Sequence, residues 1–339
     1  MRTVELGTTG THVSALALGA MTLGTVADEE SSFALLDRYV ADGGSFIDTA
    51  NGYAAWLRRV GPGEVGGHSE SVLGRWMAAR GNRDEIFLAT KGSAGWTDPE
   101  GVWPPGQAEP SWEKIPAQWE GASAPVLREA LDGSLRRLGV DHVDLYYVHV
   151  DDRSVPLTET LEALAGFVAQ GKIGYYGYSN VRSWRLATIR ELCERYGWPQ
   201  PVALQQEHSY LQRRPGLENA SVVDDEQLDY LRAHEDLSLV AYSPVLKGLY
   251  DMPPAERAQQ WAYERYAGDH SERRLAVLGE LAADLGVPAS TIVVAWLLAQ
   301  DSPRRIPLVG TSRVDRYESL AAALDLELSR EQLARLDAA

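Results

Sequence analysis

The chain has 339 residues, of which 45% are hydrophobic and 24% are charged. This is the composition of a globular protein, so it excludes collagen, a coiled coil and a disordered chain as the overall architecture. Acidic residues outnumber basic residues by 48 to 32, which gives a net charge of −16. Such an excess argues against a broad nucleic-acid footprint and against a polybasic membrane patch, so an anionic ligand would need a local positive site.

Cysteine usage and hydropathy bear on the cellular compartment. Cys193 is the only cysteine, so the chain has neither an internal disulfide nor a thiolate metal cluster. The longest strongly apolar run, about Ile292 to Ala299, is too short to span a bilayer, and the apolar stretch Ala15 to Ala20 follows polar residues instead of a basic segment. We therefore expect a cytoplasmic protein with no signal peptide, no membrane partner and no nucleic-acid partner.

Short apolar runs rich in β-branched and aromatic residues alternate along the chain with segments of helical period. This alternation is typical of parallel strands that are covered by helices. Amphipathic helices are predicted between the strands, for example where Leu36, Tyr39 and Val40 recur at helical spacing. The eight predicted strands are Ala15–Leu18, Ser45–Asp48, Ile86–Thr90, Val143–Val148, Ile173–Tyr178, Val202–Gln205, Ser238–Tyr242 and Ile306–Val309.

Eight strand-helix units predict a closed (β/α)₈ barrel, a TIM barrel of the α/β class, as one domain over residues 1–339. An open doubly wound sheet is the alternative. Before the first unit, Val4–Leu6 and His12–Val13 flank a turn with glycine at both ends, which predicts a β-hairpin that closes the opposite mouth of the barrel. In such barrels the loops that follow the strands surround the active site.

Three segments exceed the usual connection between a strand and a helix, and we expect them to form long loops over the active-site rim. They are residues 54–68, which are rich in glycine, residues 92–124, which contain four tryptophans, and residues 246–270, which contain four aromatic residues. Two interpretations of these aromatic residues remain open. They either anchor the loops on the barrel or line a substrate pocket.

Polar side chains follow the predicted strands at the ends that would face the active site. Asp48 and Tyr53 follow the second strand, Lys91 ends the third and His149 follows the fourth. Singly, such residues often cap helices or fill space. Together they suit carbonyl reduction, which needs a proton donor. The phenol of Tyr53 could give the proton, with its pKa lowered by the ammonium of Lys91. Asp48 would keep that ammonium charged, and His149 would donate a hydrogen bond to the carbonyl oxygen.

Carbonyl reduction also needs a hydride, which side chains cannot supply, so these residues imply a nicotinamide cofactor. No Gly-x-Gly-x-x-Gly segment follows any predicted strand. A Rossmann mode of cofactor binding is therefore unsupported, and the cofactor must be held in another way.

These motifs resemble those of the aldo-keto reductase superfamily over nearly the whole chain, from Leu6 to Ser329. The resemblance implies a (β/α)₈ barrel and an NADP-dependent enzyme that reduces carbonyl compounds. Four segments carry it: 46–53 and 69–74, which are similar to the aspartate-tyrosine signature, 143–149, which is similar to the histidine strand, and 171–180, which is similar to the amide-binding strand. The catalytic tetrad that it implies is Asp48, Tyr53, Lys91 and His149.

The resemblance also implies that NADP(H) lies extended across the rim. We expect no metal, because no metal-ligand spacing joins the histidines. The residues expected at the nicotinamide carboxamide are Ser179, Asn180 and Gln205, and those near its ribose are Ala20 and Met21. The pyrophosphate would be lined by Tyr242, Ser243, Pro244 and Leu246. The adenosine phosphate would meet Gly310, Thr311, Ser312 and Arg313, with Arg316 at the place of the basic residue that binds the 2′-phosphate.

The sequence departs from the family pattern at two places. His208 stands where an aromatic ring commonly stacks on the nicotinamide, so we expect a weaker or pH-sensitive stack. Ser319 and Leu320 replace the acidic and amide pair that usually contacts adenine. We therefore expect a weaker affinity for the cofactor and a weaker preference for NADPH over NADH.

Three functions follow from these residues. The first is an NADPH-dependent oxidoreductase that reduces a small aldehyde or ketone, with a flat or sugar-like substrate suggested by the tryptophans of residues 92–124. The second is an NADP(H)-binding regulatory or redox-sensing barrel with little turnover. The third is a Schiff-base lyase that uses Lys91, which is disfavoured because Asp48 keeps the amine charged. The sequence leaves the oligomeric state open.

Overall fold

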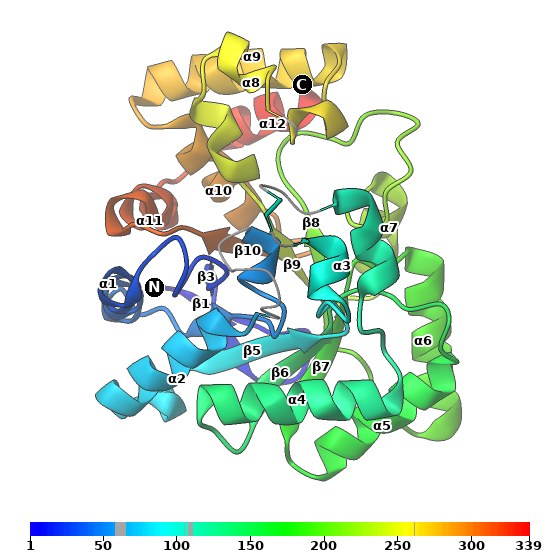
Figure 1. The fold of residues 1–339 in the computed structure, drawn as a ribbon. Coiled ribbons are helices and arrows are strands. Elements are labelled where there is room, and N and C mark those ends of the chain that lie inside the picture. Colours follow the sequence, from blue (N-terminus) through cyan, green and yellow to red (C-terminus); the bar gives the residue numbers. More distant parts are fainter. Residues whose placement is uncertain (58–65, 105, 108–110, 261) are drawn as a thin grey trace.

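The computed structural model describes residues 1–57, 66–104, 106–107, 111–260 and 262–339 (Figure 1). Residues 58–65, 105, 108–110 and 261 lie outside the described residues, and so do the side chains of Trp56 and Trp112. Parts of the predicted loops 54–68, 92–124 and 246–270 therefore also lie outside them.

Eight parallel strands close into a barrel in the order β10-β3-β4-β5-β6-β7-β8-β9. All eight predicted strands are confirmed, with ends that differ by no more than two residues. The doubly wound alternative is wrong, because β10 pairs with β9 on one side and with β3 on the other, which leaves no sheet edge. The strands are β3 Ala17–Gly19, β4 Phe46–Asp48, β5 Phe87–Gly92, β6 Val143–Val148, β7 Ile173–Ser179, β8 Ala203–Glu207, β9 Ser238–Tyr242 and β10 Arg305–Gly310.

Helices surround this barrel, and helices that follow neighbouring strands pack side by side (Figure 1). Their apolar faces bury residues such as Leu36, Leu73 and Leu131 against the outward side chains of the strands. The outer helices are α1 Glu29–Ala41, α2 His68–Arg80, α4 Ala124–Leu138, α5 Leu157–Ala169, α6 Ser183–Tyr196, α7 Asp225–Ala233, α10 Ala289–Leu298 and α11 Val314–Ala321. Further helices are α9 Asp269–Leu285 and α12 Arg330–Ala338, which pack together.

The predicted N-terminal hairpin is confirmed as an antiparallel pair, β1 Thr3–Glu5 and β2 His12–Ser14. Leu6 and Val13 of this hairpin are fully buried and belong to the same apolar cluster as the inward-facing strand residues Phe46 and Leu145. Gly7 allows the close fit, because a β-carbon there would lie 2.3 Å from the carbonyl oxygen of Asp236. The hairpin thus closes the amino end of the barrel, and the carboxyl end remains for chemistry.

The long segments after β5 and β9 contain short helices, so they are not the plain loops that the sequence suggested. Residues 92–124 include α3 Pro99–Val102 and a 3₁₀ helix at Trp112–Gln118. Residues 246–270 include 3₁₀ helices at Leu246–Asp251 and Tyr263–Arg265, with α8 Pro254–Arg257 between them. The aromatic residues Tyr250, Tyr263 and Tyr266 are buried in one cluster with α9 and α10, so in this segment they anchor the chain.

The described residues contain no single helix that is both long enough and apolar enough to cross a membrane. Helices α9 and α10 reach that length and hydropathy only as a pair, and they meet at an angle of 101°.

Candidate active site

The alternation of side chains along the strands brings three polar residues to the inside of the barrel. In β5, Phe87 belongs to the interior cluster and Leu88 to the outer one, so Lys91 lies on the interior side. The same alternation puts Asp48 of β4 inside, and also His149, which directly follows β6. Since β4, β5 and β6 are neighbours, these side chains converge at the carboxyl end of the barrel.

Lys91 is the centre of a buried network of hydrogen bonds. Its Nζ donates to the hydroxyl of Tyr53 over 2.9 Å, to the carbonyl oxygen of Thr49 over 2.8 Å, and to the carboxylate of Asp48. Gln205 Nε2 donates to the other carboxylate oxygen of Asp48 over 2.9 Å. An ammonium has three protons, and all three are engaged here. Lys91 is therefore held as a charged donor and is a poor nucleophile, which argues against a Schiff base.

The phenol of Tyr53 has a raised pKa. Burial raises the pKa of this phenol, the Lys91 ammonium acts in the opposite direction, and the charge of Asp48 adds to the rise. Lys91 therefore acts on the Tyr53 pKa in the predicted direction, but the loss of solvation outweighs this attraction and the net pKa is raised. The phenol is protonated at neutral pH, as a proton donor must be.

In this buried site Lys91 is positively charged and His149 is neutral. Burial acts to lower the pKa of the Lys91 ammonium, but the charge of Asp48 and the hydrogen bonds to Asp48 and Tyr53 outweigh burial, so the pKa is raised. Burial lowers the pKa of His149 well below its usual range, and the Lys91 charge adds to the effect. The imidazole is therefore neutral at physiological pH, and its ring lies edge-on to that of Tyr53 with 5.7 Å between centroids.

A second polar group adjoins His149 at the end of β7. Asn180 Nδ2 donates to the carbonyl oxygen of His149 over 2.7 Å and to Ser179 Oγ over 3.0 Å. The hydroxyl of Tyr242, at the end of β9, donates to Asn180 Oδ1 over 2.8 Å. The structure thus joins three of the predicted cofactor residues to each other and to the neighbourhood of Tyr53.

His208 contacts the outer helix α10. Its ring lies beside Trp296 of α10, with 6.2 Å between the ring centroids. Burial lowers the pKa of His208 well below its usual range, and Arg305 and Arg274 add to this, so the ring is neutral. Among the described residues, the aromatic side chain that hydrogen-bonds to the Asn180 amide is that of Tyr242.

The residues predicted at the pyrophosphate form a turn after β9. Ser243, Leu246 and Lys247 all have positive φ, and Gly248 continues this left-handed run. The carbonyl oxygen of Pro244 accepts a hydrogen bond from Ser209. Successive backbone groups in such a conformation can form a concave site for an anion.

The residues predicted at the adenosine end lie between β10 and α11. Gly310 pairs with Gly19 of β3, and the hydroxyl of Thr22 donates to the carbonyl oxygen of Thr311 over 2.8 Å. This bond ties the segment of Ala20 and Met21 to that of Thr311 and Ser312. Arg313 and Arg316 are both exposed. The Arg313 guanidinium pairs with both carboxylate oxygens of Asp315, at 2.9 and 2.5 Å.

Glu120 is a residue of this region that sequence reasoning missed. Its carboxylate accepts from Asn51 Nδ2 over 2.8 Å and from the backbone N–H groups of Ser93 and Gly95 over 2.8 and 3.1 Å. These partners lie beside Tyr53 and Lys91 in the chain. No sequence signal indicates this role, because Glu120 is 27 residues from Ser93 and belongs to no motif.

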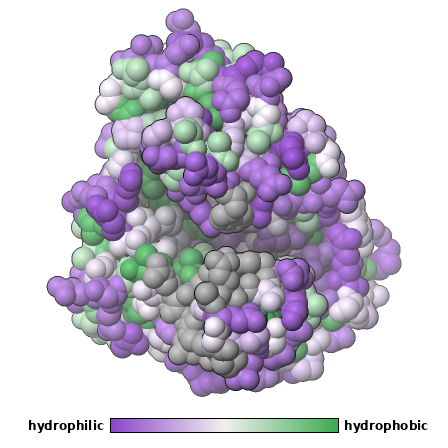
Figure 2. Space-filling view, turned by 45° about the horizontal axis from the view of Figure 1, so that its top comes forward, coloured by the Kyte–Doolittle hydropathy of each residue, from purple (hydrophilic) through white to green (hydrophobic). Residues whose placement is uncertain are grey.

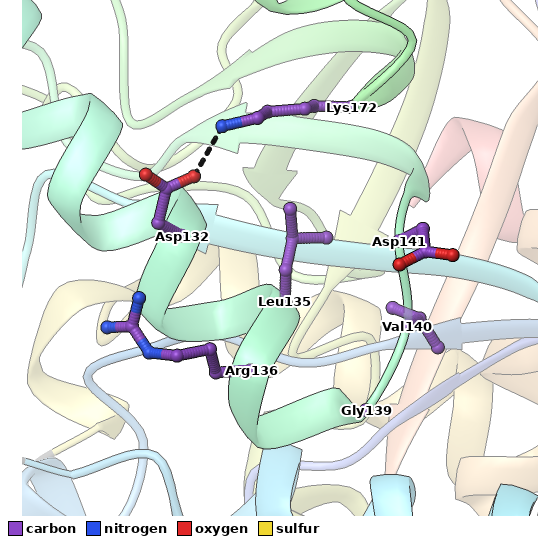
Figure 3. A pocket seen from close by; sticks show the side chains of 7 residues that line it. All are labelled: Asp132, Leu135, Arg136, Gly139, Val140, Asp141 and Lys172. Carbon is purple, nitrogen blue, oxygen red and sulfur yellow. Dashed lines mark hydrogen bonds and ion pairs between the residues drawn. The ribbon is translucent and has the colours of Figure 1, made fainter.

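Two further observations concern sites for other ligands. Within the ranges that the structure describes, no three His, Cys, Asp or Glu residues are grouped as metal ligands. A surface depression of about 480 Å³ lies next to the starts of β6 and β7 and is lined by Asp132, Leu135, Arg136, Gly139, Val140, Asp141 and Lys172 (Figure 3). It is at the amino end of the barrel, away from Tyr53, and its Lys172 is paired with Asp132 at 2.6 Å.

Comparison with known proteins identifies the family. The model of the aldo/keto reductase family matches residues 15–339. The chain is an aldo/keto reductase. The family consists of oxidoreductases that typically use NAD(P)H and small carbonyl substrates, so this chain is an enzyme of that class.

Relatives of this aldo/keto reductase align over nearly all of its length. Norsolorinic acid reductase B of Aspergillus parasiticus is 32% identical over 337 residues, which cover 95% of this chain and 79% of the relative. An uncharacterized oxidoreductase of Bacillus subtilis is 31% identical, and the alignment covers 99% of this chain and 95% of the relative. The aryl-alcohol dehydrogenase (NADP+) of Phanerodontia chrysosporium is 29% identical, and the alignment covers 96% of this chain and 82% of the relative.

Proposed function

We propose that this aldo/keto reductase uses NADPH to reduce an aldehyde or ketone to the alcohol, with Tyr53 as the proton donor. The observation that carries this proposal is the buried chain of hydrogen bonds from Asp48 through Lys91 to Tyr53, beside the neutral ring of His149. A protonated phenol, a fixed cation and a neutral imidazole are the groups that stabilise a carbonyl oxygen as it gains negative charge.

Each residue of this hydrogen-bonded network has one task in the reaction. The bound nicotinamide supplies the hydride. Tyr53 gives its proton to the carbonyl oxygen, and the Lys91 ammonium, 2.9 Å away, stabilises the phenolate that this transfer leaves. Asp48 holds Lys91 in place, and the His149 ring donates a hydrogen bond to the same oxygen. Burial of these groups strengthens each interaction because water does not screen them.

The donor groups around the rim fit NADP(H). Ser179 is the acceptor in its hydrogen bond with Asn180, so its own proton can serve the carboxamide. The left-handed turn from Ser243 suits the pyrophosphate, and the exposed guanidinium groups of Arg313 and Arg316 suit the 2′-phosphate. Tyr242 is a better candidate than His208 for the nicotinamide face, because it already contacts Asn180.

The proposed function is tested with the purified chain, NADPH and a panel of aldehydes and ketones, by following NADPH consumption. Two of the relatives above are named for norsolorinic acid and for aryl alcohols, so the panel starts with aromatic carbonyl compounds and adds sugar-derived ones. We expect turnover within this panel. Tight binding of NADPH without turnover of any carbonyl would instead favour the regulatory barrel.

The pH profile provides a second test. We expect kcat/KM for reduction to be flat between about pH 6.5 and about pH 9, and to fall only at higher pH. Burial raises the pKa of Tyr53, so the phenol loses its proton only in alkaline solution. Burial also holds the pKa of His149 well below its usual range, so the imidazole causes no change in kcat/KM near neutral pH. Steady-state rates at saturating NADPH measure this. A decline centred near pH 7 would contradict the assigned charge states.

The ion pair of Arg313 bears on cofactor preference. Its two partners are 68% and 59% exposed, so the pair with Asp315 is weak and a 2′-phosphate can displace the carboxylate. We expect Arg313→Ala to weaken NADPH binding by about 10- to 100-fold, because charge-assisted hydrogen bonds to the phosphate are lost. NADH binding should change less than about 2-fold. Titration of tryptophan fluorescence with each nucleotide measures both.

A matched control removes an arginine that pairs with the same helix at another place. Arg38 of α1 is bonded to Glu318 of α11 at 3.2 Å, so Arg38→Ala alters the charge near α11 without touching the segment 310–313. This variant should bind both nucleotides as the parent does. If Arg313→Ala weakens NADH and NADPH equally, Arg313 does not recognise the 2′-phosphate.

A further inference from the structure

A fully buried amide, that of Gln206, lies on the outer side of β8. Gln205 bonds to Asp48 inside the barrel, so the period of two along the strand turns the next side chain, Gln206, outward. Figure 2 shows that hydrophilic residues cover most of the face drawn there, yet Gln206 is 0% exposed and Gln227, in the first turn of α7, is 4% exposed. A buried amide needs hydrogen-bond partners, so the contacts of these two glutamines are informative.

The hydrogen bonds of Gln206 fix which way its amide points. Its Nε2 donates to the carbonyl oxygens of Val181 and Ala220 over 3.1 and 2.8 Å, and to Gln227 Oε1 over 3.1 Å. All three partners are acceptor oxygens, so Nε2 must face them, and Gln206 Oε1 accepts the backbone N–H of Asn180 over 2.6 Å. Gln227 Nε2 also donates to the Val181 carbonyl, over 3.0 Å. The two glutamines thus hold the link from β7 to α6 from outside the barrel.

Asn180 has an unusual backbone conformation in this link. Its φ is 54°, which lies in the left-handed region that residues other than glycine seldom adopt, although asparagine tolerates it better than most. A residue keeps such a conformation only where its surroundings hold it. The bond from its N–H to Gln206 does this on the outer side. On the inner side its side chain bonds to Ser179, His149 and Tyr242.

The side chain of Asn180 connects this outer network to the nicotinamide end of the site. Its amide bonds to the carbonyl oxygen of His149 and to the hydroxyl of Tyr242, so a rotation of the Asn180 backbone would displace or break both bonds. Without Gln206 the N–H of Asn180 loses its acceptor, and one of the contacts that hold the left-handed conformation is gone. A displacement of roughly 1 Å between reacting groups can lower a rate by about 100-fold.

We infer that Gln206 is a positioning residue for the nicotinamide of NADP(H). It acts through the backbone of Asn180 and so sets the place of a side chain that is proposed to bind the carboxamide. Gln227 assists from α7 through its bonds to Gln206 and Val181. The inference rests on the proposed function, because Asn180 has this task only if NADP(H) lies across the rim.

The test uses Gln206→Met, which keeps an unbranched side chain of similar size and removes the amide. Calorimetric titration measures the affinity for three probes: NADP+, its 3-acetylpyridine analogue, in which an acetyl group replaces the carboxamide, and 2′,5′-ADP, which has no nicotinamide. We expect Gln206→Met to weaken NADP+ binding about 5- to 20-fold and to leave 2′,5′-ADP within about 2-fold. The parent should prefer NADP+ to the analogue, and the variant should lose most of that preference. At saturating NADPH, kcat should fall by about 10-fold or more.

Gln227→Met is the matched control. It removes a buried amide from the same network but leaves the bond between Gln206 and Asn180 in place. We expect its affinity for each of the three probes to stay within about 2-fold of the parent. If Gln206→Met does not fold, Gln206→Asn replaces it, because this variant keeps an amide that is one methylene too short to make all of these bonds. It should show the same selective loss of NADP+ affinity.

The outcomes separate this inference from the proposed function. An equal loss of affinity for NADP+ and 2′,5′-ADP in Gln206→Met would mean that Gln206 supports the whole rim, and it would overturn the inference. Unchanged NADP+ affinity, or a loss of the same size in Gln227→Met, would also overturn it. In each of these cases a parent chain that binds NADP+ and reduces a carbonyl leaves the proposed function intact. If the parent chain binds no NADP+, the proposed function fails and the inference fails with it.

Discussion

Tyr53→Phe should lower kcat for carbonyl reduction by about 1,000-fold while the chain still binds NADPH with unchanged affinity. The substitution removes only the hydroxyl that donates the proton and that accepts the Lys91 hydrogen bond at 2.9 Å. The ring remains, so the edge-on contact with His149 persists. Single-turnover rates with preloaded NADPH measure the loss at the chemical step, and fluorescence titration measures nucleotide affinity.

Tyr146→Phe is the matched control for this variant. Tyr146 is a fully buried tyrosine of β6 whose side chain belongs to the outer cluster between sheet and helices, and its hydroxyl has no hydrogen-bond partner among the residues that the structure describes. Its loss should leave kcat unchanged within about 2-fold, because no charge or hydrogen bond depends on it. If Tyr53→Phe retains rapid turnover, another group supplies the proton and the proposed acid is wrong.

The strands could be predicted from the sequence because barrel strands carry a local signal. Each is a short run of buried residues bounded by helical segments, and the period of two then fixes which side chains face inward. Phe87 and Leu88 show this: the first lies inside the barrel and the second outside, so the inward position of Lys91 follows. The convergence of Asp48, Lys91 and His149 could therefore be predicted from the alternation along the strands and the closure of the barrel alone.

Contacts within the long segments could not be predicted in this way. Glu120 binds Asn51 and Ser93 because the segment after β5 folds back on itself. No hydrophobic periodicity in the sequence indicates this reversal of the chain. The placement of His208 beside Trp296 depends on how α10 packs, which is a tertiary property. The Tyr53 pKa likewise depends on the balance of burial against Lys91, which sequence spacing does not give.

The second large effect is expected for Lys91→Met, which should reduce both activity and stability. We expect kcat to fall by at least about 100-fold, because the phenolate of Tyr53 loses its stabilising cation. We also expect the free energy of unfolding to fall by about 3 to 5 kcal/mol, because the substitution leaves the carboxylate of Asp48 buried without its countercharge. Both side chains of this ion pair are fully buried, so water cannot take over the lost interaction. Urea unfolding at about pH 8 measures the loss of stability.

The pH dependence of that loss tests its cause. Burial raises the pKa of Asp48, and without the opposing ammonium the folded carboxyl binds a proton still more readily than the unfolded one. A group with a raised folded pKa favours the folded state below its unfolded pKa and loses that contribution as the pH rises through the folded pKa. The deficit of Lys91→Met should therefore shrink between about pH 8 and about pH 5, and adding Asp48→Asn should restore most of the stability but none of the turnover. An equal deficit at both pH values would mean that lost packing, and not an unpaired charge, destabilises the variant.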